Sequence, residues 1–339
     1  MSSTERIIER LGHSPCSGEA LSEELGVSRN QVWKHVEALR GRGYRIEGAP
    51  GGGYELVARP DRLYAEELLP GLGTRWLAHD LHHLETTDST NRVAGDLARE
   101  DAPHGTAVVA EHQSAGRGRL GRRFHSPAHQ NLYVSLVLRP TISITQAPTI
   151  ILGAGLAVAQ TVAETLGAPE RVEIKWPNDV LVDGLKISGI LMEMSAEATQ
   201  VGHLVLGMGV NLNVSPETFP EEFRSRATSL AAILGHPVDR VAFTRRLFVT
   251  LEGVLETHAK AGFEGLRADF EALYRMRGRE IEVSDPGGSV RSGIAGGIGS
   301  DGTLELHLES GDLVRIVAGD VTLRPQTLGG APAPQGPTG

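Results

Sequence analysis

The sequence predicts a multidomain α+β protein, and three changes of pattern along the chain indicate its parts. Residues 1–60 begin with apolar residues at helical spacing and end in a strand-like stretch, which predicts a winged helix-turn-helix domain. Residues 64–275 mix strand-like and helical runs, which predicts one large mixed α/β domain. Residues 278–325 contain short alternating strands without a helix signal, which predicts a small β-barrel. The 339 residues, 40% of them hydrophobic, suffice for two or three cores.

The N-terminal helices are predicted from apolar spacing and from the residues that begin and end them. Residues 4–11 and 18–25 carry apolar residues at helical spacing, and Gly26 ends the second helix. Ser28 is a natural N-cap for a third helix that runs to Arg40, because its hydroxyl can accept a hydrogen bond from the first turn. Two helices joined by so short a turn form a helix-turn-helix.

The wing and the local charge bear on what this domain binds. Residues 44–57 alternate weakly around a turn at 49–53, which predicts a β-hairpin. Residues 28–45 carry five basic residues and one acidic residue, although the net charge of the chain is −9. A small basic face on an acidic protein favours a local nucleic-acid contact over nonspecific coating. The alternative is a three-helix module that binds another protein, because helical bundles share this pattern.

The elements of the other two parts are expected from apolar runs that polar turns interrupt. The expected strands are 106–111, 132–138, 172–175, 187–194 and 204–213, and the expected helices are 91–100, 146–166 and 241–261. In the C-terminal part, turns at 285–288 and 300–302 separate the short strands. The tail 326–339 is rich in Pro, Gly and Ala and is expected to be disordered, because it cannot form a core.

The sequence indicates a cytoplasmic location and no membrane partner. Cys16 is the single cysteine, which excludes an intramolecular disulfide and a cysteine-based zinc cluster and suits a reducing compartment. No signal peptide is recognised, and the longest apolar run, 150–158, is too short to cross a bilayer. His125 and His129 have no clear third metal ligand nearby, so we expect them to be surface or loop residues.

Residues 114–123 are the most informative segment, because they place three glycines and four arginines directly after a predicted strand. Glycine lets the backbone approach a ligand closely, so N–H groups can converge on a phosphate or carboxylate while arginines supply charge and forked donors. The segment therefore predicts an anion-binding loop, with a solvated surface turn as the alternative. It is not a P-loop, because no Gly-Lys-Ser/Thr follows it or occurs elsewhere.

A second cluster lies downstream, where polar residues interrupt apolar strands between positions 172 and 194. It contains Lys175-Trp176-Pro177-Asn178-Asp179 and, after the turn at Gly184, Lys186-Ile187-Ser188-Gly189. Together with Asp88-Ser89-Thr90-Asn91, Gln113 and Gly209-Val210-Asn211, these motifs resemble those of biotin protein ligases. The resemblance extends over about residues 1–325 and is to the bifunctional type that also represses a biotin operon. It implies a central domain similar to class II aminoacyl-tRNA synthetases and an SH3-like C-terminal barrel.

The resemblance implies a biotin pocket in the central domain. Its implied members are Ser89, Thr90, Asn91, Gln113, Gly116, Arg117, Gly118, Arg119, Lys186 and Gly189. Hydroxyl and amide groups suit the donors and acceptors of a ureido ring, and such groups reject a ligand that leaves them unpaired. The structural alternative for residues 89–91 is N-capping of the helix that follows.

The resemblance also implies an ATP site beside this pocket. Its implied members are Arg119, Arg122, Lys175, Asn178, Asp179 and Asn211, with Mg²⁺ at Asp179 and with Lys186, Arg119 and Arg122 acting in catalysis. Joining a carboxylate to the α-phosphate of ATP brings two anions together, so dense positive charge is needed. From the residues alone, Lys186 could be a solvated charge, and Asn178 and Asp179 could hold a turn. Phe124 stands where many family members carry tryptophan, so the aromatic ring is retained without an indole N–H.

The implied activity is formation of biotinyl-5′-AMP from biotin and Mg-ATP, followed by transfer to a lysine of a biotin carboxyl carrier protein. The implied DNA partner is an operator that Ser28, Arg29, Asn30, Gln31 and Lys34 contact, bound by a homodimer that forms when adenylate is present. Two alternatives stay open. A lipoate ligase would run the same adenylation on another cofactor, and a ligand-sensing transcription factor would bind the ligand without catalysis.

Overall fold

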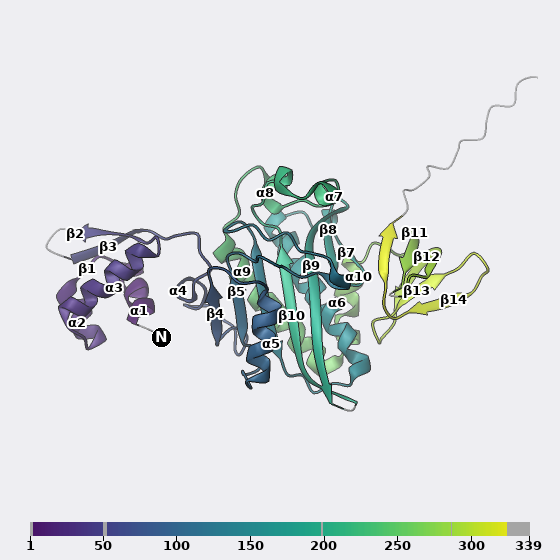
Figure 1. Ribbon diagram of the computed structural model, residues 1–339, viewed down its shortest axis with the longest axis horizontal. Helices are drawn as coiled ribbons and strands as arrows, with labels where there is room; N and C mark the ends of the chain where they lie inside the picture. Colours follow the sequence, from purple (N-terminus) through teal and green to yellow (C-terminus); the bar gives the residue numbers. More distant parts are fainter. Residues whose placement is uncertain (1–2, 50–52, 198, 286, 324–339) are drawn as a thin grey trace, which may run out of the picture.

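The computed structural model describes residues 3–49, 53–197, 199–285 and 287–323, in three parts that follow the expected order (Figure 1). The N-terminal helices and wing lie at one end, the large sheet in the middle and a small β-domain at the other end. The multidomain α+β class is therefore confirmed. The disorder expected for 326–339 falls outside the described residues.

The N-terminal part contains the predicted helices and wing. Its elements are α1 (Ser3–His13), β1 (Cys16–Ser17), α2 (Gly18–Leu25), α3 (Arg29–Gly41), β2 (Arg45–Ala49) and β3 (Gly53–Ala58). Ser28 caps α3 as expected: its hydroxyl accepts a hydrogen bond from the Gln31 N–H, and the Gln31 side chain accepts one from the Ser28 N–H. β2 and β3 pair antiparallel as the wing, whose tip at 50–52 lies outside the described residues. These elements share a core of their own.

The central part is built on one seven-stranded sheet. Its elements are α4 (Ala65–Leu68), β4 (Leu81–Leu84), α5 (Thr90–Arg99), β5 (Ala107–Ala110), β6 (Leu132–Leu138), α6 (Ala147–Leu166), β7 (Val172–Lys175), β8 (Asp179–Val182), β9 (Leu185–Glu197), β10 (Gln200–Val210), α7 (Glu221–Arg224), α8 (Leu230–Leu234), α9 (Arg240–Ala261) and α10 (Arg267–Leu273). The strand order is β4-β5-β6-β10-β9-β8-β7, antiparallel except for the β4–β5 pair.

Helices cover both faces of this sheet, and β5 shows why. Successive side chains of a strand point to opposite faces. Val108 therefore packs with Ala94 of α5, whereas Ala107 and Val109 join the large core that α6 and α9 complete on the other side. The segment Ile144–Leu166 is apolar and long enough to cross a membrane, but 72% of its most apolar window is buried inside the protein, as in a core helix.

The C-terminal part consists of strands within the described residues. These are β11 (Glu280–Ser284), β12 (Val290–Ile298), β13 (Leu304–His307), β14 (Leu313–Ile316) and β15 (Asp320–Leu323), in one antiparallel sheet ordered β14-β13-β12-β11-β15. The predicted β-rich domain is confirmed, and the SH3-like barrel stays a prediction. Its apolar side chains continue the core of the central part. Trp176 Nε1 donates to the Gly302 carbonyl at 2.9 Å, so this domain lies against the turn after β7.

Two boundaries differ from expectation near the motifs. β9 begins at Leu185 rather than at residue 187, so Lys186 lies inside a paired strand. Asp179 does not sit in a turn but begins β8, opposite Gly189 of β9. Both shifts arise from cross-strand pairing, which a short polar stretch of sequence does not reveal. They bring residues of the two neighbouring motifs side by side.

Candidate active site and nucleic-acid interface

Buried polar side chains meet where α5 begins. Ser89, Thr90 and Asn91 are only 2–5% exposed. The Thr90 N–H and hydroxyl both donate to the Gln113 side-chain oxygen, at 2.9 and 3.1 Å. The Ser135 hydroxyl of β6 lies 2.8 Å from the Thr90 hydroxyl and 2.6 Å from Asn91 Oδ1. The structure thus brings these predicted biotin residues together and adds Ser135, which no sequence motif marked.

N-capping alone does not account for this cluster. Ser89 occupies the N-cap position of α5, but among the described residues its side chain makes no capping hydrogen bond. The Asp88 carboxylate instead accepts from the Ser89 N–H at 2.8 Å. The Ser89 hydroxyl is therefore not used to cap the start of α5 and is free to bond a ligand.

A cavity of about 20 Å³ lies here, lined by Ser89, Thr90, Asn91, Gln113, Arg117, Phe124, Leu191, Met208 and three glycines of β9 and β10. Gly207 and Gly209 lie on one face of β10, because side chains of a strand alternate. A Cβ on Gly209 would lie 2.5 Å from the Phe124 ring, and one on Gly207 would lie 1.9 Å from Asn91 Oδ1. Glycine therefore creates the space that Phe124 and Asn91 fill. Since the cavity holds at most about one water, a larger ligand would need the side chains that fill it, such as Phe124 or Asn91, to shift.

The Gly/Arg segment folds back on itself beside this cavity. The Gly118 N–H donates to the Arg122 carbonyl at 2.7 Å, and the Phe124 N–H donates to the Gly116 carbonyl at 2.9 Å. Gly116 has no room for a side chain, because a Cβ would lie 2.7 Å from the Phe124 carbonyl oxygen. The glycines thus permit a tight loop whose backbone is hydrogen-bonded to Phe124.

Three arginines of this loop each contact an oxygen on a different element. The pairs are Arg117–Glu193 of β9 at 3.5 Å, Arg119–Asn178 Oδ1 before β8 at 3.1 Å, and Arg122–Asp320 of β15. Sequence reasoning assigned no role to Glu193, although it lies in the second cluster, or to Asp320, which lies outside every motif. These oxygens are acceptors of the kind that an anionic ligand also offers to arginine.

The charges around this loop influence one another. Burial lowers the pKa of Arg119, against the attraction of Asp320 and Asp179. Burial likewise lowers the pKa of Lys175, against the same two carboxylates. For Asp320, burial acts to raise the pKa, but the hydrogen bond and charge of Arg122 and the charges of Lys175 and Arg119 outweigh it and lower the pKa. Several desolvated cations thus share two carboxylates, so an added anion would be stabilised here.

Lys186 lies at the border between the cavity and this charged group. Its Nζ is 2.6 Å from Asp179 Oδ1 and would be 3.0 Å from a Cβ on Gly189, one of the glycines of the cavity. Asn178 is fixed beside it, because its Nδ2 donates to the Ile190 carbonyl at 2.8 Å. Lys186 is thus ion-paired with Asp179, and Asn178 is bonded to β9, while the catalytic and ATP-binding roles of these residues stay predictions.

Asn211 is placed differently from the other predicted ATP residues. It is buried, its Nδ2 donates to the Thr228 carbonyl at 3.1 Å, and its Oδ1 lies 3.4 Å from Asn131 Nδ2. The side chain therefore holds two loops together. A phosphate contact would require one of these hydrogen bonds to be exchanged, so the ATP role of Asn211 stays a prediction.

No metal cluster is preassembled in the described part of the chain, where no group of three or more His, Cys, Asp or Glu side chains could hold an ion. His125 and His129 are loop residues, as expected. His129 lies within 3.4 Å of the Glu111 carboxylate and 3.2 Å of that of Glu85, which gives it a structural role.

The exposed side of α3 carries the residues predicted to contact DNA. Ser28, Arg29, Asn30 and Lys34 are exposed. Gln31 is exposed as well, but its side-chain oxygen accepts the capping hydrogen bond, which restricts what it can contact. The structure adds Trp33, a large apolar side chain that is 51% exposed beside them.

The basic face is narrower than residues 28–45 suggested. The three other basic residues of this stretch form ion pairs: Arg40 with Glu37, Arg42 with Glu66 and Arg45 with Glu47. The count of basic residues did not reveal these partners, two of which lie outside the stretch. Within the described residues, Arg29 and Lys34 have no ion-pair partner.

Three segments of the chain match known families, in the order of the three structural parts. Residues 4–55 match an HTH domain, 83–211 the biotin/lipoate A/B protein ligase family, and 278–324 the biotin protein ligase C terminal domain. The chain is 35% identical over 317 residues to the bifunctional ligase/repressor BirA of Bacillus subtilis, covering 94% of this chain and 96% of that protein. This chain belongs to the biotin protein ligase family.

Two further members of the biotin protein ligase family show what this chain shares with them in sequence and in fold. The bifunctional ligase/repressor BirA of Escherichia coli is 32% identical over 311 residues, covering 91% of this chain and 92% of that protein. A structure of the biotin protein ligase from Aquifex aeolicus in complex with biotin and ATP matches with a TM-score of 0.62 at 30% identity, covering 73% of this chain and 99% of that chain. The predicted relation of the central domain to class II aminoacyl-tRNA synthetases is thereby confirmed.

Proposed function

We propose that this biotin protein ligase activates biotin with ATP to biotinyl-5′-AMP and passes biotin to a lysine of a biotin carboxyl carrier protein. The observation that carries the proposal is the position of Lys186, which joins the polar, glycine-lined cavity to the cluster of Arg119, Lys175 and Asp179. The family membership supports the biotin reaction over lipoate ligation, because the relatives that match over most of the chain are biotin ligases.

The reaction needs the two anionic substrates held together. A biotin carboxylate oxygen attacks the α-phosphorus, and the bond to pyrophosphate breaks. The acceptor lysine then attacks the acyl carbon, and AMP leaves. Lys186 and Arg119 would stabilise negative charge in both steps, and Arg122 would pair with the leaving phosphates once it releases Asp320. Gln113, Thr90 and Ser89 would orient the ureido ring. No enzyme nucleophile is required, because the phosphate already activates the carbonyl.

Mg²⁺ fits the residues around Asp179. This ion prefers one or two carboxylate or amide oxygens together with phosphate oxygens. Asp179, and Asn178 beside it, supply such oxygens at the edge of the cationic cluster. We infer that Asp179 would hold the ion, which would neutralise phosphate charge during transfer.

The test is biotin-dependent exchange of pyrophosphate into ATP. We expect Lys186→Ala to lower the exchange rate on the order of 100-fold or more, because it removes one electrostatic stabiliser at the reacting centre. Lys260→Ala, at the exposed end of α9, is the matched control. Near-normal exchange by a folded Lys186→Ala protein would refute the assignment. Absence of exchange in the natural protein would favour the ligand-sensing factor without catalysis.

We further propose that the protein is an operator-binding repressor whose dimerisation depends on biotinyl-5′-AMP. The HTH match and the exposed Arg29, Asn30 and Lys34 on α3 support DNA reading through the major groove. The adenylate would draw the arginine loop away from its protein partners and order it, which requires a coupling of about 1 to 3 kcal/mol. Sedimentation with and without biotin and ATP tests the dimer. Arg29→Ala should weaken operator binding, whereas Arg171→Ala, on the ligase core, should not.

A further inference from the structure

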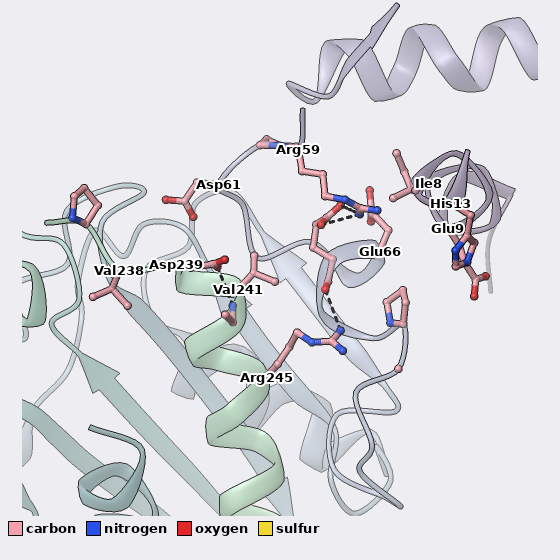
Figure 2. A pocket seen from close by; sticks show the side chains of 17 residues that line it. Ile8, Glu9, His13, Arg59, Asp61, Glu66, Val238, Asp239, Val241 and Arg245 are labelled. Carbon is pink, nitrogen blue, oxygen red and sulfur yellow. Dashed lines mark hydrogen bonds and ion pairs between the residues drawn. The ribbon is translucent and has the colours of Figure 1, made fainter. Parts of the chain in front are cut away.

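The N-terminal domain meets the ligase core across an open cleft. This cleft of about 860 Å³ lies between α1, residues 59–61 of the linker, α4 and the start of α9 (Figure 2). Arg59 and Arg245 reach toward one another from opposite sides of it. Because this open cleft separates much of the two facing surfaces, a few contacts must decide how the two domains are oriented.

Those contacts converge on two adjacent glutamates of α4. Glu66 is 4% exposed and Glu67 is 9% exposed. Arg59 donates to both oxygens of Glu67, at 2.8 and 3.0 Å, and the Tyr44 hydroxyl donates to Glu67 Oε1 at 2.8 Å. Arg42 lies 2.6 Å from Glu66 Oε1. Three side chains, two from the DNA-binding domain and one from the linker, thus contact two carboxylates of the ligase core.

Tyr64 adds the apolar component of the junction. Its ring stacks on Tyr44 with 6.3 Å between centroids, and the Arg42 guanidinium lies 3.9 Å above it. Arg59 also packs on α1, since a Cβ on Gly12 would lie 2.6 Å from its Nη2. Arg42, Tyr44 and Arg59 therefore each connect the N-terminal domain, or the linker that leaves it, with α4 or Tyr64 of the ligase core.

α4 is itself held rigidly on the core. Arg245 of α9 donates to the Leu68 carbonyl at 2.9 Å. Just upstream, the Leu63 N–H donates to Glu111 at 2.7 Å, and the buried Arg240 bonds both the Asp61 side chain and Glu111 at 2.9 Å. The linker and α4 are thus bound to the ligase core. How the N-terminal domain is oriented on that core then depends on the contacts of Glu66 and Glu67.

We propose that Glu66 and Glu67 are positioning residues that set the orientation of the winged helix on the ligase core, and so the operator affinity of the dimer. The second clause rests on the proposed repressor function. A dimer gains affinity on a palindrome only when both recognition helices reach their half-sites together, so a loosened orientation lowers the effective concentration of the second helix.

The test uses full-length Glu66→Gln/Glu67→Gln protein, with Glu221→Gln/Glu222→Gln as the matched control. The control changes two adjacent, exposed glutamates of another short helix, α7. Distances between spin labels on Glu23→Cys and Lys260→Cys, in a Cys16→Ser background, report the orientation directly. We expect the distribution to broaden in the Glu66/Glu67 variant alone. An unchanged width would overturn the proposal whether or not the protein binds DNA.

DNA binding gives the second readout. We expect the Glu66/Glu67 variant to bind a palindromic operator on the order of 10-fold more weakly, while its affinity for a single half-site and its pyrophosphate exchange stay as in the natural protein. Tyr44→Phe, which removes one hydroxyl, should give a smaller loss of the same kind. Equal losses on half-site and palindrome would show damage to the DNA-binding domain and contradict the proposal. If the natural protein binds no operator, the repressor function fails, and the label distances still decide the orientation.

Discussion

Arg240 and Arg122 make the same kind of bond, an ion pair with a carboxylate, in opposite surroundings. The side chains of Arg240 and Glu111 are both 0% exposed. Arg122 is 56% exposed and Asp320 31% exposed. The first pair lies under the domain linker, and the second joins the arginine loop to the C-terminal domain.

The difference in burial separates a structural charge from an exchangeable one. Breaking a buried pair leaves an uncompensated charge and costs about 3–5 kcal/mol, whereas an exposed pair contributes about 0–1 kcal/mol. The linker is therefore fixed to the core. The loop can exchange a carboxylate for a phosphate at small cost, which is what the proposed adenylation requires.

The largest expected effect comes from breaking the buried pair. Glu111→Gln should lower the free energy of unfolding by about 3–5 kcal/mol, because Arg240 then stays buried without a countercharge. Urea unfolding measures it. Glu85→Gln, an exposed carboxylate that also contacts His129, is the control and should change stability little. Equal free energies of unfolding for the two variants would show that the buried ion pair of Glu111 and Arg240 stabilises the protein no more than an exposed contact does.

Substitutions in the arginine loop should lower the rate of pyrophosphate exchange rather than the free energy of unfolding. Arg119→Ala should lower pyrophosphate exchange on the order of 100- to 1,000-fold, because one stabiliser of the developing charge is lost. Its free energy of unfolding should change by less than about 1 kcal/mol. Arg123→Ala, in the same loop, is the control. A loss of stability without a loss of exchange would place Arg119 among the structural arginines.

Acid should weaken the buried pair through Glu111. Burial works to raise the pKa of Glu111, but the hydrogen bond from His83, the charge of Arg240 and the Leu63 N–H together lower the pKa from 4.5 to about 2. The contribution of this depressed pKa is present above pH 4.5 and is lost as the pH falls toward 2, on the order of 1–3 kcal/mol. Urea unfolding at several pH values should show this loss in the natural protein and not in Glu111→Gln. Parallel curves for the two proteins would contradict it.

The smallest effect is expected for the exposed pair. Asp320→Asn should change the free energy of unfolding by less than about 1 kcal/mol but release Arg122, so trypsin should cut the empty loop a few times faster. Biotin with ATP should protect residues 117–123 in both proteins. Asp183→Asn, which breaks the exposed pair with Arg171, is the control. Unchanged cleavage in every condition would exclude ordering of the loop by adenylate.

Local pattern in the sequence determined the order of the parts and many of the elements. Helical spacing and the capping residue Ser28 predicted α3, and alternation predicted the wing, because both signals arise from residues a few positions apart. The glycine and arginine composition of 114–123 likewise indicated an anion-binding loop before any partner was known. Lys186 and Asp179 were predicted by resemblance, and their roles stay predictions.

Only the tertiary structure decided which oxygens hold the arginines of the loop and how the domains are joined. Arg122 meets Asp320 across 198 positions, and Arg240 meets Glu111 across 129. Glu67 accepts from Tyr44, and Phe124 fills the space over Gly209, without any periodic signal in the chain. Such contacts depend on how strands pair and domains pack, so no short stretch of sequence carries them. The sequence by itself therefore determined the local elements and the anion-binding chemistry of residues 114–123. Only the tertiary structure determined which residues pair with the arginines of that loop.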